Sequence, residues 1–593
     1  MESKGIKKII EQNYRADIDA IKGIAIIAVV FYHMGLLKSG YLGVDAFFVI
    51  NGFFIVPAML MLFKGEQKQS MFSFWEKRIL RLWPMILVAT FICLLVGYWG
   101  MLPDDYENLC ESVIATNLFS ENILSAITTA NYWDVANDYK PLMHMWYVGI
   151  LVEFYIVSPL ILWCISKFAS WRKLDFQKLG QNTIIVLAIL SFLFYLSPLS
   201  EGPGRFYYLP ARFWELALGG IMALFVSRIQ NKGWFENTSI ISVVTILMLL
   251  VICIGLIWPN YPPMPALIVT AFTSAYLLVA NHVKNVFNRL LTWRPLCMLG
   301  KMSFSIFVWH QILLAFYRYF VTDELSPLFV LCFWAVTLLV SWLSYMFIEQ
   351  KVKVSHRAFA IAACSMVLIA IPSAAIYLHA GVVRDVPEMN IYFDNVHRGM
   401  HAEYVDRVYE MDCDFENDGR IKVLVVGNSF ARDWVNMLLE SKYKDSLDIT
   451  YAYEYREDLI PRIQQCDYLF SRIIKSEIPS YVWENISNDK VWGIGTKTFG
   501  NSNGTIYARR NRADYFETTI VPAEGFLTMR AHEMAEWGGR FCDMMGPVMD
   551  ANGNIKVFTP DHKYISQDCT HLTEDGAKYY AEIFDIDGIF KMK

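Results

Sequence analysis

Long apolar runs alternate with short polar loops between residues 20 and 380 of the chain. A helix needs roughly 20 apolar residues to cross the hydrocarbon core of a bilayer. By this measure the pattern predicts about eleven transmembrane helices, of which the first and the fifth are short. The predicted spans are residues 20–37, 41–63, 82–102, 143–166, 183–199, 211–229, 239–258, 264–282, 302–320, 327–348 and 358–379.

The charges of the loops support this count, because lysine and arginine gather on the cytoplasmic side of membrane proteins. With a cytoplasmic N-terminus, the loops after even-numbered spans face the cytoplasm. Each of them holds basic residues: Lys64, Lys68, Lys77, Arg78 and Arg81; Lys167, Arg172, Lys173 and Lys178; Arg228 and Lys232; Lys284, Arg289 and Arg294; and Lys351, Lys353 and Arg357. The opposite loop, 103–141, has only Lys140 as a basic residue. An odd number of spans then places residues 383–593 outside the cytoplasm.

Residues 383–593 read as a soluble domain, for which the pattern predicts an α/β fold. The apolar run 421–426 predicts a buried parallel strand, and the apolar spacing after it predicts a helix over 430–440. Ser429 lies at the turn between them, where open α/β sheets place their sites. A serine at such a turn can also simply cap the helix. Further strands are predicted near 447–453, 466–471 and 490–494.

Near the C-terminus, Asp568 and His571 stand three residues apart, just before a predicted helix at 574–584. His571 could serve as the general base for Ser429, and Asp568 could orient its imidazole, as in a catalytic triad. The N-terminus of the helix after Ser429 would offer backbone N–H groups to a developing oxyanion. The sequence therefore predicts a serine nucleophile with Ser429, Asp568 and His571 as its catalytic residues.

Composition narrows the class of protein. The 593 residues are 55% hydrophobic and 18% charged, and the formal net charge of −5 argues against a nucleic-acid partner. The polar start of the chain, without a small-residue cleavage site after the first apolar run, predicts a retained span rather than a signal peptide. Cys413, Cys466, Cys542 and Cys569 of the outer domain allow three disulfide pairings or free thiols, and both remain open.

Ionisable residues within predicted spans are costly and usually functional. Any one of them could make a structural hydrogen bond, but together they predict a polar cavity inside the bundle. They are His33, Asp45, Glu153, Arg212, Glu215, His310 and Glu349.

Short motifs follow one another in a characteristic order through residues 12–350. They are Tyr14-Arg15-Ala16-Asp17-Ile18-Asp19, His33, Gly43-Val44-Asp45 with Phe47-Phe48, Asn51-Gly52-Phe53, Arg78-Ile79-Leu80-Arg81 with Trp83-Pro84, Trp146 with Phe154-Tyr155, Arg212-Phe213-Trp214-Glu215, Trp309-His310 and Phe347-Ile348-Glu349. In this set and order, the chain resembles the acyltransferase family 3 membrane proteins.

The resemblance implies a membrane-embedded unit that uses cytoplasmic acetyl-CoA as donor substrate and serves extracytoplasmic glycans. It implies that His33 is catalytic, as a general base or a transient acyl carrier. It also implies that Arg78 and Arg81 bind the donor, and two arginines on one helix face suit phosphates. Anchoring on the cytoplasmic side is the alternative reading of this pair. Supporting roles are implied for Arg15, Asp45 and Glu349.

The chain departs from the family pattern at several positions. After Trp146 the family usually has Ser, and Glu five positions beyond the Trp, where this chain has Tyr147 and Leu151. Glu153 is displaced by two positions, so no role is transferred to it. Lys22 stands where the family usually has Arg, and Asn51 where it usually has Ser.

The outer domain resembles the SGNH hydrolase superfamily over roughly residues 420–590. This resemblance rests on the strand–turn–helix around Ser429 and on Asp568-Cys569-Thr570-His571-Leu572. It implies that Ser429, Asp568 and His571 are catalytic. The superfamily usually has Asp where Asn428 stands, which could alter activation of the serine. An oxyanion asparagine is expected within 495–504, at Asn501 or Asn503.

Together these features predict three regions: a transmembrane acyltransferase domain at 1–356, a further helix and linker at 357–420, and an α/β SGNH (flavodoxin-like) domain at 421–593. The predicted function is transfer of acetyl from acetyl-CoA to an extracytoplasmic glycan, which could be lipopolysaccharide O-antigen, peptidoglycan or exopolysaccharide. The expected place is the bacterial plasma membrane, in contact with membrane lipid, with no metal and no bound cofactor. The alternatives are a membrane-anchored glycan esterase, which would need only one span, and a transporter, for which no inverted hydropathy repeat is seen.

Overall fold

The computed structural model describes residues 15–63, 70–128, 137–229, 238–257, 264–279, 292–397, 399–416 and 418–590. Tyr14, Lys64, Lys68, Lys232, Lys284, Arg289 and the side chain of Arg228 lie outside the described part. The chain divides into two compact units. We call Met1–Trp99 with Asn108–Ala375 the helical unit, and Gly100–Glu107 with Ile376–Lys593 the α/β unit.

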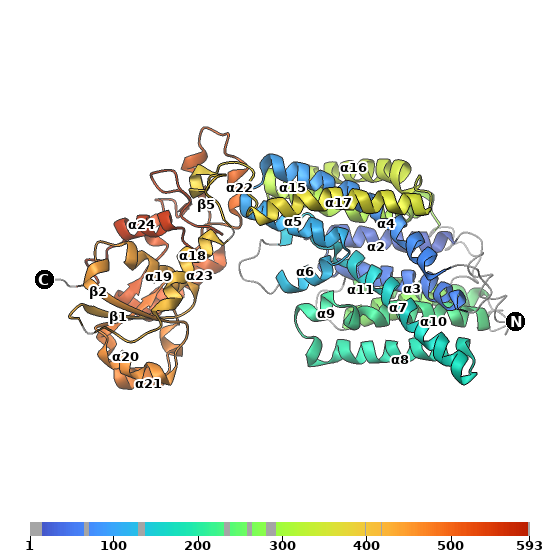
Figure 1. Ribbon diagram of the computed structural model, residues 1–593, viewed down its shortest axis with the longest axis horizontal. Helices are drawn as coiled ribbons and strands as arrows, with labels where there is room; N and C mark the ends of the chain where they lie inside the picture. Colours follow the sequence, from blue (N-terminus) through green and yellow to red (C-terminus); the bar gives the residue numbers. More distant parts are fainter. Residues whose placement is uncertain are drawn as a thin grey trace. The chain divides into compact units, whose positions relative to one another are not determined.

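Each of the eleven predicted spans overlaps a helix of the structure (Figure 1). These helices are α2 (Ala16–His33), α3 (Gly43–Leu62), α4 (Met71–Gly100), α7 (Trp146–Arg172), α8 (Phe176–Leu196), α10 (Leu209–Ile229), α11 (Thr238–Ile257), α12 (Met264–Val279), α15 (Ser303–Phe320), α16 (Pro327–Ser344) and α17 (His356–Leu378). Shorter helices lie between them: α5 (Pro103–Asn117), α6 (Glu121–Thr128), α9 (Pro203–Tyr207) and α14 (Arg294–Lys301).

Overlap alone does not make each helix a membrane span. Within the described residues, seven helices are long and apolar enough to cross a membrane, or eight if α14 and α15, which are bent by 72°, form one broken span. α2 falls short because it carries Asp17, Asp19 and Lys22, and the apolar helices within α11 and α12 are shorter. The chain is thus a multi-pass membrane protein, while the count of eleven stays a prediction.

Two helix boundaries differ from the prediction and change where site residues lie. α2 begins and ends four residues before the predicted span, so His33 is its last residue and not an interior one. α4 begins eleven residues before the predicted span, so Arg78 and Arg81, expected on one helix face, lie on the same continuous helix as that span. An apolar run marks only the part of a helix that faces hydrocarbon, and it misses polar first turns.

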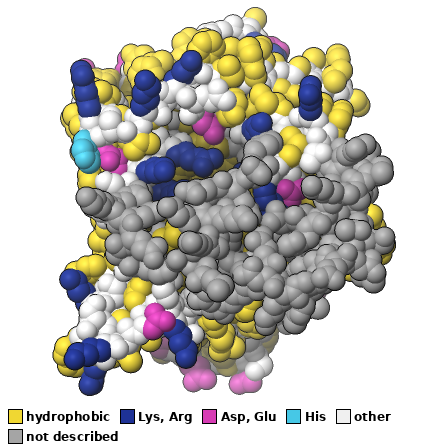
Figure 2. Space-filling view, turned by 90° about the vertical axis from the view of Figure 1, so that its right-hand side faces the viewer, with side chains coloured by type: hydrophobic (Ala, Val, Ile, Leu, Met, Phe, Trp, Pro, Cys, Tyr) yellow, Lys and Arg dark blue, Asp and Glu magenta, His cyan; other side chains and the backbone are white. Residues whose placement is uncertain are grey.

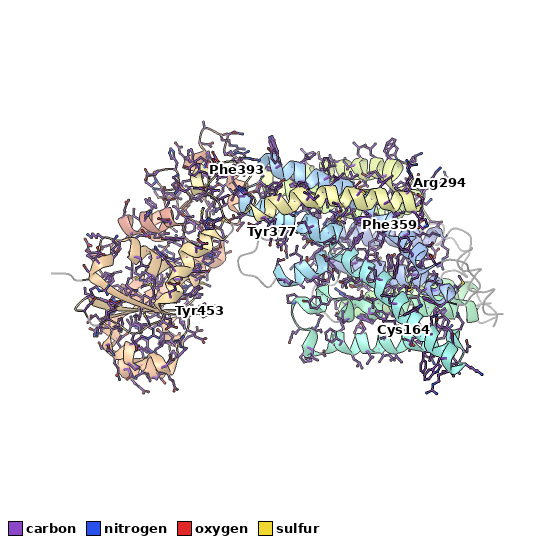
Figure 3. All side chains as sticks on the ribbon, viewed as in Figure 1. Cys164, Arg294, Phe359, Tyr377, Phe393 and Tyr453 are labelled. Atoms are coloured by element: carbon purple, nitrogen blue, oxygen red, sulfur yellow. The ribbon has the colours of Figure 1, made fainter. Side chains whose placement is uncertain are left out.

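Aromatic contacts hold α17 against α4. Phe359 near the start of α17 and Tyr377 near its end are both labelled in Figure 3. The Phe359 ring lies 5.8 Å from that of Phe72 and 5.7 Å from that of Trp83, centroid to centroid. The outer face of α17 is apolar and exposed, as lipid contact requires, through Ile361, Val367, Leu368 and Ile371.

A five-stranded parallel sheet forms the centre of the α/β unit, in the order β2-β1-β3-β4-β6. The strands are β1 (Ile421–Val426), β2 (Leu447–Ala452), β3 (Tyr468–Ser471), β4 (Val491–Ile494) and β6 (Phe541–Cys542). The first four lie at the predicted segments, which confirms the α/β class. The antiparallel pair β5 (Thr519–Ile520) and β7 (Ile555–Lys556) and strand β6 were not predicted, because two residues give no readable pattern.

Helices cover both faces of this sheet (Figure 1). α19 (Ser429–Glu440) and α24 (Glu574–Ile583) share one core with Val423 and Val425, around the fully buried Trp434. α20 (Ile460–Gln465), α21 (Ser480–Asn485) and the end of α23 (Glu524–Trp537) share the other core with Leu424 and Val426. Alternate side chains of β1 therefore enter opposite cores, as a doubly covered strand requires.

Candidate active sites

A tight turn at the carboxyl end of β1 presents Ser429 as the first residue of α19. Gly427 has a φ of +143°, and a Cβ there would come within 2.5 Å of the Cβ of Arg472, so only glycine fits. The side chain of Asn428 accepts a hydrogen bond from the N–H of Phe430 at 3.1 Å and caps α19. β1 lies between β2 and β3, so Ser429 stands at the switch point of the sheet.

His571 connects Ser429 to Asp568. Its Nε2 lies 2.7 Å from Ser429 Oγ, and its Nδ1 lies 2.6 Å from Asp568 Oδ2. An ionised carboxylate only accepts, so Nδ1 carries the proton and Nε2 accepts from the serine hydroxyl. The structure thus brings the three predicted residues together in the order that general-base activation of a serine needs.

The turn between Asp568 and His571 orients the carboxylate. Asp568 Oδ1 accepts the backbone N–H groups of Thr570 at 2.9 Å and of His571 at 2.7 Å, and Cys569 takes a φ of +69°. Burial raises the pKa of Asp568, but the hydrogen bonds and charge of His571 outweigh it and leave the pKa below its ordinary value. Asp568 is therefore ionised near neutral pH and stabilises a protonated His571.

A buried ion pair, which the sequence analysis did not single out, lies beneath the triad. Lys497 Nζ is 2.9 Å from Asp433 Oδ2 and 3.8 Å from the centre of the Phe430 ring, and both charged side chains are 1% exposed. Asp433 also accepts the N–H of Leu572, next to His571. Burial lowers the pKa of Lys497 to about 8. The pair joins α19, the loop after β4 and the His571 segment.

The two candidate oxyanion asparagines lie in different surroundings. Asn503 donates to the carbonyls of Ser566 and Gln567 at 2.7 and 2.8 Å and accepts from the thiol of Cys569. Its amide therefore holds the segment that leads to Asp568. Asn501 is exposed, and among the described residues no hydrogen bond joins either amide to Ser429.

The cysteines of the α/β unit also bear on this site. Cys413, Cys466, Cys542 and Cys569 are all free thiols, so the structure has none of the three disulfide pairings that the sequence allowed. Cys569 is buried within the Asp568–His571 turn, where burial raises the pKa of its thiol. It acts there as a neutral donor.

The helical unit contains a cavity of about 450 Å³ with a cationic lining. Its polar wall includes Arg15, Lys22, Asn51, Arg78, Arg81, Tyr147 and Tyr155. A second cavity of about 410 Å³ shares Lys22 and Arg81 with it and adds Lys77, Lys301 and Glu349. Figure 2 shows lysine and arginine side chains gathered around a hollow at one end of this unit. Such a lining suits a polyanionic ligand.

The predicted donor-binding pair lines the first cavity, and the supporting residues Arg15 and Glu349 line the first and the second cavity respectively. Arg78 and Arg81 both line the first cavity, one helical turn apart on α4, and the guanidinium of Arg78 lies 5.5 Å from the centre of the Phe74 ring. Arg15 lines it as well and pairs with Asp17 at 2.6 Å. Glu349 lines the second cavity and accepts from Ser305 at 2.9 Å.

His33 and Asp45 do not line either cavity. Asp45 accepts from Arg212 at 2.7 Å, and Arg212 also pairs with Glu215 at 2.8 Å, in a network that is almost fully buried. This network ties α3 to α10, which fits a structural role. The backbone carbonyl of His33 accepts from Arg318 at 2.8 Å, and its ring packs against His310.

Two positions at which the chain departs from the family pattern are partners. Asn51 donates to the hydroxyl of Tyr147 at 2.8 Å, and both residues line the cavity. The residues at these two departures are therefore in direct contact, which neither position alone could show. The displaced Glu153 accepts from Asn122 at 2.9 Å.

Comparison with known proteins identifies the family to which the chain belongs. The family described as "Acyltransferase domain" matches residues 15–346. The O-acetyltransferase OatA of Staphylococcus aureus strain NCTC 8325 is 24% identical over 377 residues, which are 60% of each chain. A putative O-acetyltransferase of strain MSSA476 is 26% identical over 362 residues, which are 59% of each. The chain thus spans about 60% of the length of these curated relatives, and no solved structure matches it. Because the family match covers more than half of the sequence, the chain belongs to the acyltransferase family 3 membrane proteins.

Proposed function

We propose that the protein is a membrane O-acetyltransferase that moves acetyl from cytoplasmic acetyl-CoA to a hydroxyl of an extracytoplasmic glycan. Family membership and likeness to O-acetyltransferases support acyl transfer. The observation that carries the proposal is the hydrogen-bonded triad of Ser429, His571 and Asp568 in a chain that also has a cationic cavity. One site suits an acyl donor and the other an acyl-serine.

The donor end of the proposal rests on the cavity of the helical unit. Arg78, Arg81 and Lys22 supply positive charge for the phosphates of acetyl-CoA, and guanidinium groups bind phosphate oxygens in pairs. Phe47, Phe53 and Phe307 give the same cavity an apolar part that suits the pantetheine arm. Acetyl-CoA acts as substrate here, not as a resident cofactor.

At the outer site, His571 Nε2 removes the proton from Ser429 as the oxygen attacks the acyl carbonyl carbon. The bond from that carbon to the previous carrier breaks, and the carrier leaves with the proton from His571. A glycan hydroxyl then attacks the acyl-serine, while His571 takes its proton and returns it to Ser429. Peptidoglycan, lipopolysaccharide O-antigen and exopolysaccharide all offer such hydroxyls.

The remaining parts of the proposal concern placement. The chain would cross a bacterial plasma membrane about eleven times, with its N-terminus in the cytoplasm. The α/β unit would then lie outside, as an SGNH-type domain. The basic residues in the loops after even-numbered spans support this orientation. The parallel sheet, with Ser429 at its switch point, supports the SGNH-type domain.

Mass spectrometry of cell-surface glycans tests the proposal. We expect glycans from cells with the intact chain to carry acetyl groups, and we expect both deletion of the gene and Ser429→Ala to remove them. Ser446→Ala, at an exposed serine of the same unit, is the matched control and should change nothing. If only the deletion removes the acetyl groups, Ser429 has no role in the transfer. More acetyl on the glycans after deletion would indicate an esterase, and an unchanged acetyl content would contradict acyl transfer.

A further inference from the structure

Three histidines from separate elements form a cluster in the helical unit. The ring of His310, on α15, lies 5.2 Å from that of His33, at the end of α2, centroid to centroid. The ring of His144, just before α7, lies 5.3 Å from that of His310, centroid to centroid. His310 and His144 are at most 1% exposed. At these separations the ring edges are in contact.

The hydrogen bonds of His310 determine its tautomer. Nδ1 lies 2.8 Å from the carbonyl oxygen of Phe307 and 3.1 Å from that of Ile306. Carbonyl oxygens only accept, so Nδ1 carries the proton and Nε2 has a free lone pair. Nε2 is buried and has no hydrogen-bond partner among the described residues. Leaving an acceptor buried and unpaired is costly, so this nitrogen calls for a functional explanation.

The cluster lies directly behind the wall of the donor cavity. Phe307 lines that cavity, and its ring is 5.0 Å from His144 and 5.9 Å from His310. Tyr147 lines the same wall, 5.3 Å from Phe307. A donor bound in that cavity would therefore have these histidines behind the wall that Phe307 forms.

Arg318 fixes the position of His33 in this cluster. Its guanidinium donates to the backbone carbonyl of His33 at 2.8 Å and pairs with Asp138 at 3.0 Å. It thereby satisfies a carbonyl at the end of α2 that no further helical turn could satisfy. The backbone of His33 is thus held at a defined place, and its ring lies tilted by 54° against that of His310.

We propose that His310 is a catalytic residue, the general base for acyl transfer at His33. The inference rests on the proposed function and names a second participant in its first step. A lone pair of His33 attacks the thioester carbon, a nitrogen–carbon bond forms, and the carbon–sulfur bond breaks. The proton on the other His33 nitrogen passes to Nε2 of His310, which hands it to the departing thiolate. The products are acyl-His33 and the free thiol, and His310 is neutral again.

Transfer of radiolabelled acetyl from acetyl-CoA to the full chain in liposomes tests this step. The parent carries Ser429→Ala so that acyl groups stay on the helical unit, and peptide mass spectrometry locates the label. We expect label on His33, at least about 100-fold slower labelling in His310→Gln, and acetyl-CoA affinity within twofold of the parent. Trp309→Phe, which changes the neighbouring side chain and its bond to Ser344, is the matched control and should label at the parental rate.

Each other outcome also decides the matter. Labelling of His310→Gln at the parental rate would overturn the role of His310, and so would the absence of label from His33 in the parent. If the unmodified chain still acetylates glycan in that case, the proposed function stands and only this inference fails. If His310→Gln does not bind acetyl-CoA, His310→Gly with added imidazole replaces it: restored labelling supports the base, and none overturns it.

Discussion

The two units place their polar groups in different ways. In the α/β unit, Ser429, His571 and Asp568 come from two distant turns and meet through bonds of 2.6 to 2.7 Å. In the helical unit, the cations Arg15, Lys22, Arg78 and Arg81 surround a cavity of about 450 Å³. The first arrangement controls the position of one proton, whereas the second supplies a field of positive charge.

This difference determines what each site should tolerate. A proton transfer depends on hydrogen-bond geometry, so the triad should fail when any member loses its functional atom. A charge field acts over several ångströms and is shared, so each arginine should contribute only part of the donor affinity. Mutations that separate these two behaviours test the comparison directly.

The largest effect is expected at the triad. Ser429→Ala and His571→Ala should each lower acetyl transfer by at least about 10³-fold, and the double variant should be no worse than either one, because the residues act as a unit. Initial rates of glycan acetylation measure this. Asn428→Asp is the control, since aspartate also caps a helix, and it should stay within a few-fold of the parent. Additive losses in the double variant would contradict the triad.

The buried pair of Lys497 and Asp433 should show the next largest effect. Lys497→Met leaves the Asp433 carboxylate buried without its partner, which costs about 3–5 kcal/mol of unfolding free energy. Lys497→Met with Asp433→Leu removes both charges and should recover much of that loss. Hydrogen exchange of β1 amides in the full chain measures the difference. If the single and double variants lose the same unfolding free energy, the Lys497–Asp433 ion pair does not stabilise the contact between these segments.

The sequence predicts those parts of the α/β unit whose contacting residues lie close together along the chain. β1 to β4 and α19 can each be recognised from their own four to twelve consecutive residues, which is the length over which local patterns are informative. Ser429, Asp568 and His571 were predictable because each sits at a recognisable strand or helix boundary. Asn503 was named as an oxyanion candidate, but its hydrogen-bond partners could not be predicted, since its amide donates to a carbonyl 63 residues away. Lys497 gave no signal at all, because a lysine in a loop after a strand is usually solvated.

In the helical unit, the sequence predicted the helices better than their ends. Apolar runs located the eleven long helices and missed the shorter ones. Arg78 and Arg81 lie on a polar first part of α4 that such runs cannot reveal. The pairing of Asn51 with Tyr147 and the packing of His33 on His310 depend on which helices are neighbours. Hydropathy does not determine that arrangement.

A smaller effect is expected for the donor-site arginines. Arg78→Ala or Arg81→Ala should each weaken acetyl-CoA binding about 10- to 100-fold. This loss of affinity should be smaller at high salt than at low salt, because salt screens the attraction between charges. Equilibrium binding at two ionic strengths measures this. Lys178→Ala removes an exposed cation elsewhere and serves as the control. Unchanged affinity in both arginine variants would move the donor away from this cavity.

The smallest effect concerns acid sensitivity of the α/β unit at His401, on α18 (Met400–Asp406). Burial lowers its pKa to about 4, with Arg432 and His571 acting in the same direction and Asp568 and Asp433 opposing them. Between about pH 6.5 and pH 4, the unfolded chain binds a proton that the folded chain does not, so stability falls as the pH falls. His401→Gln cannot bind that proton, and it should lose about 1 kcal/mol less than the parent between pH 7 and 5.5. Hydrogen exchange of β1 amides, compared between variant and parent at each pH, measures this loss. An identical pH dependence in both proteins would show that His401 is as well solvated in the folded chain as in the unfolded chain.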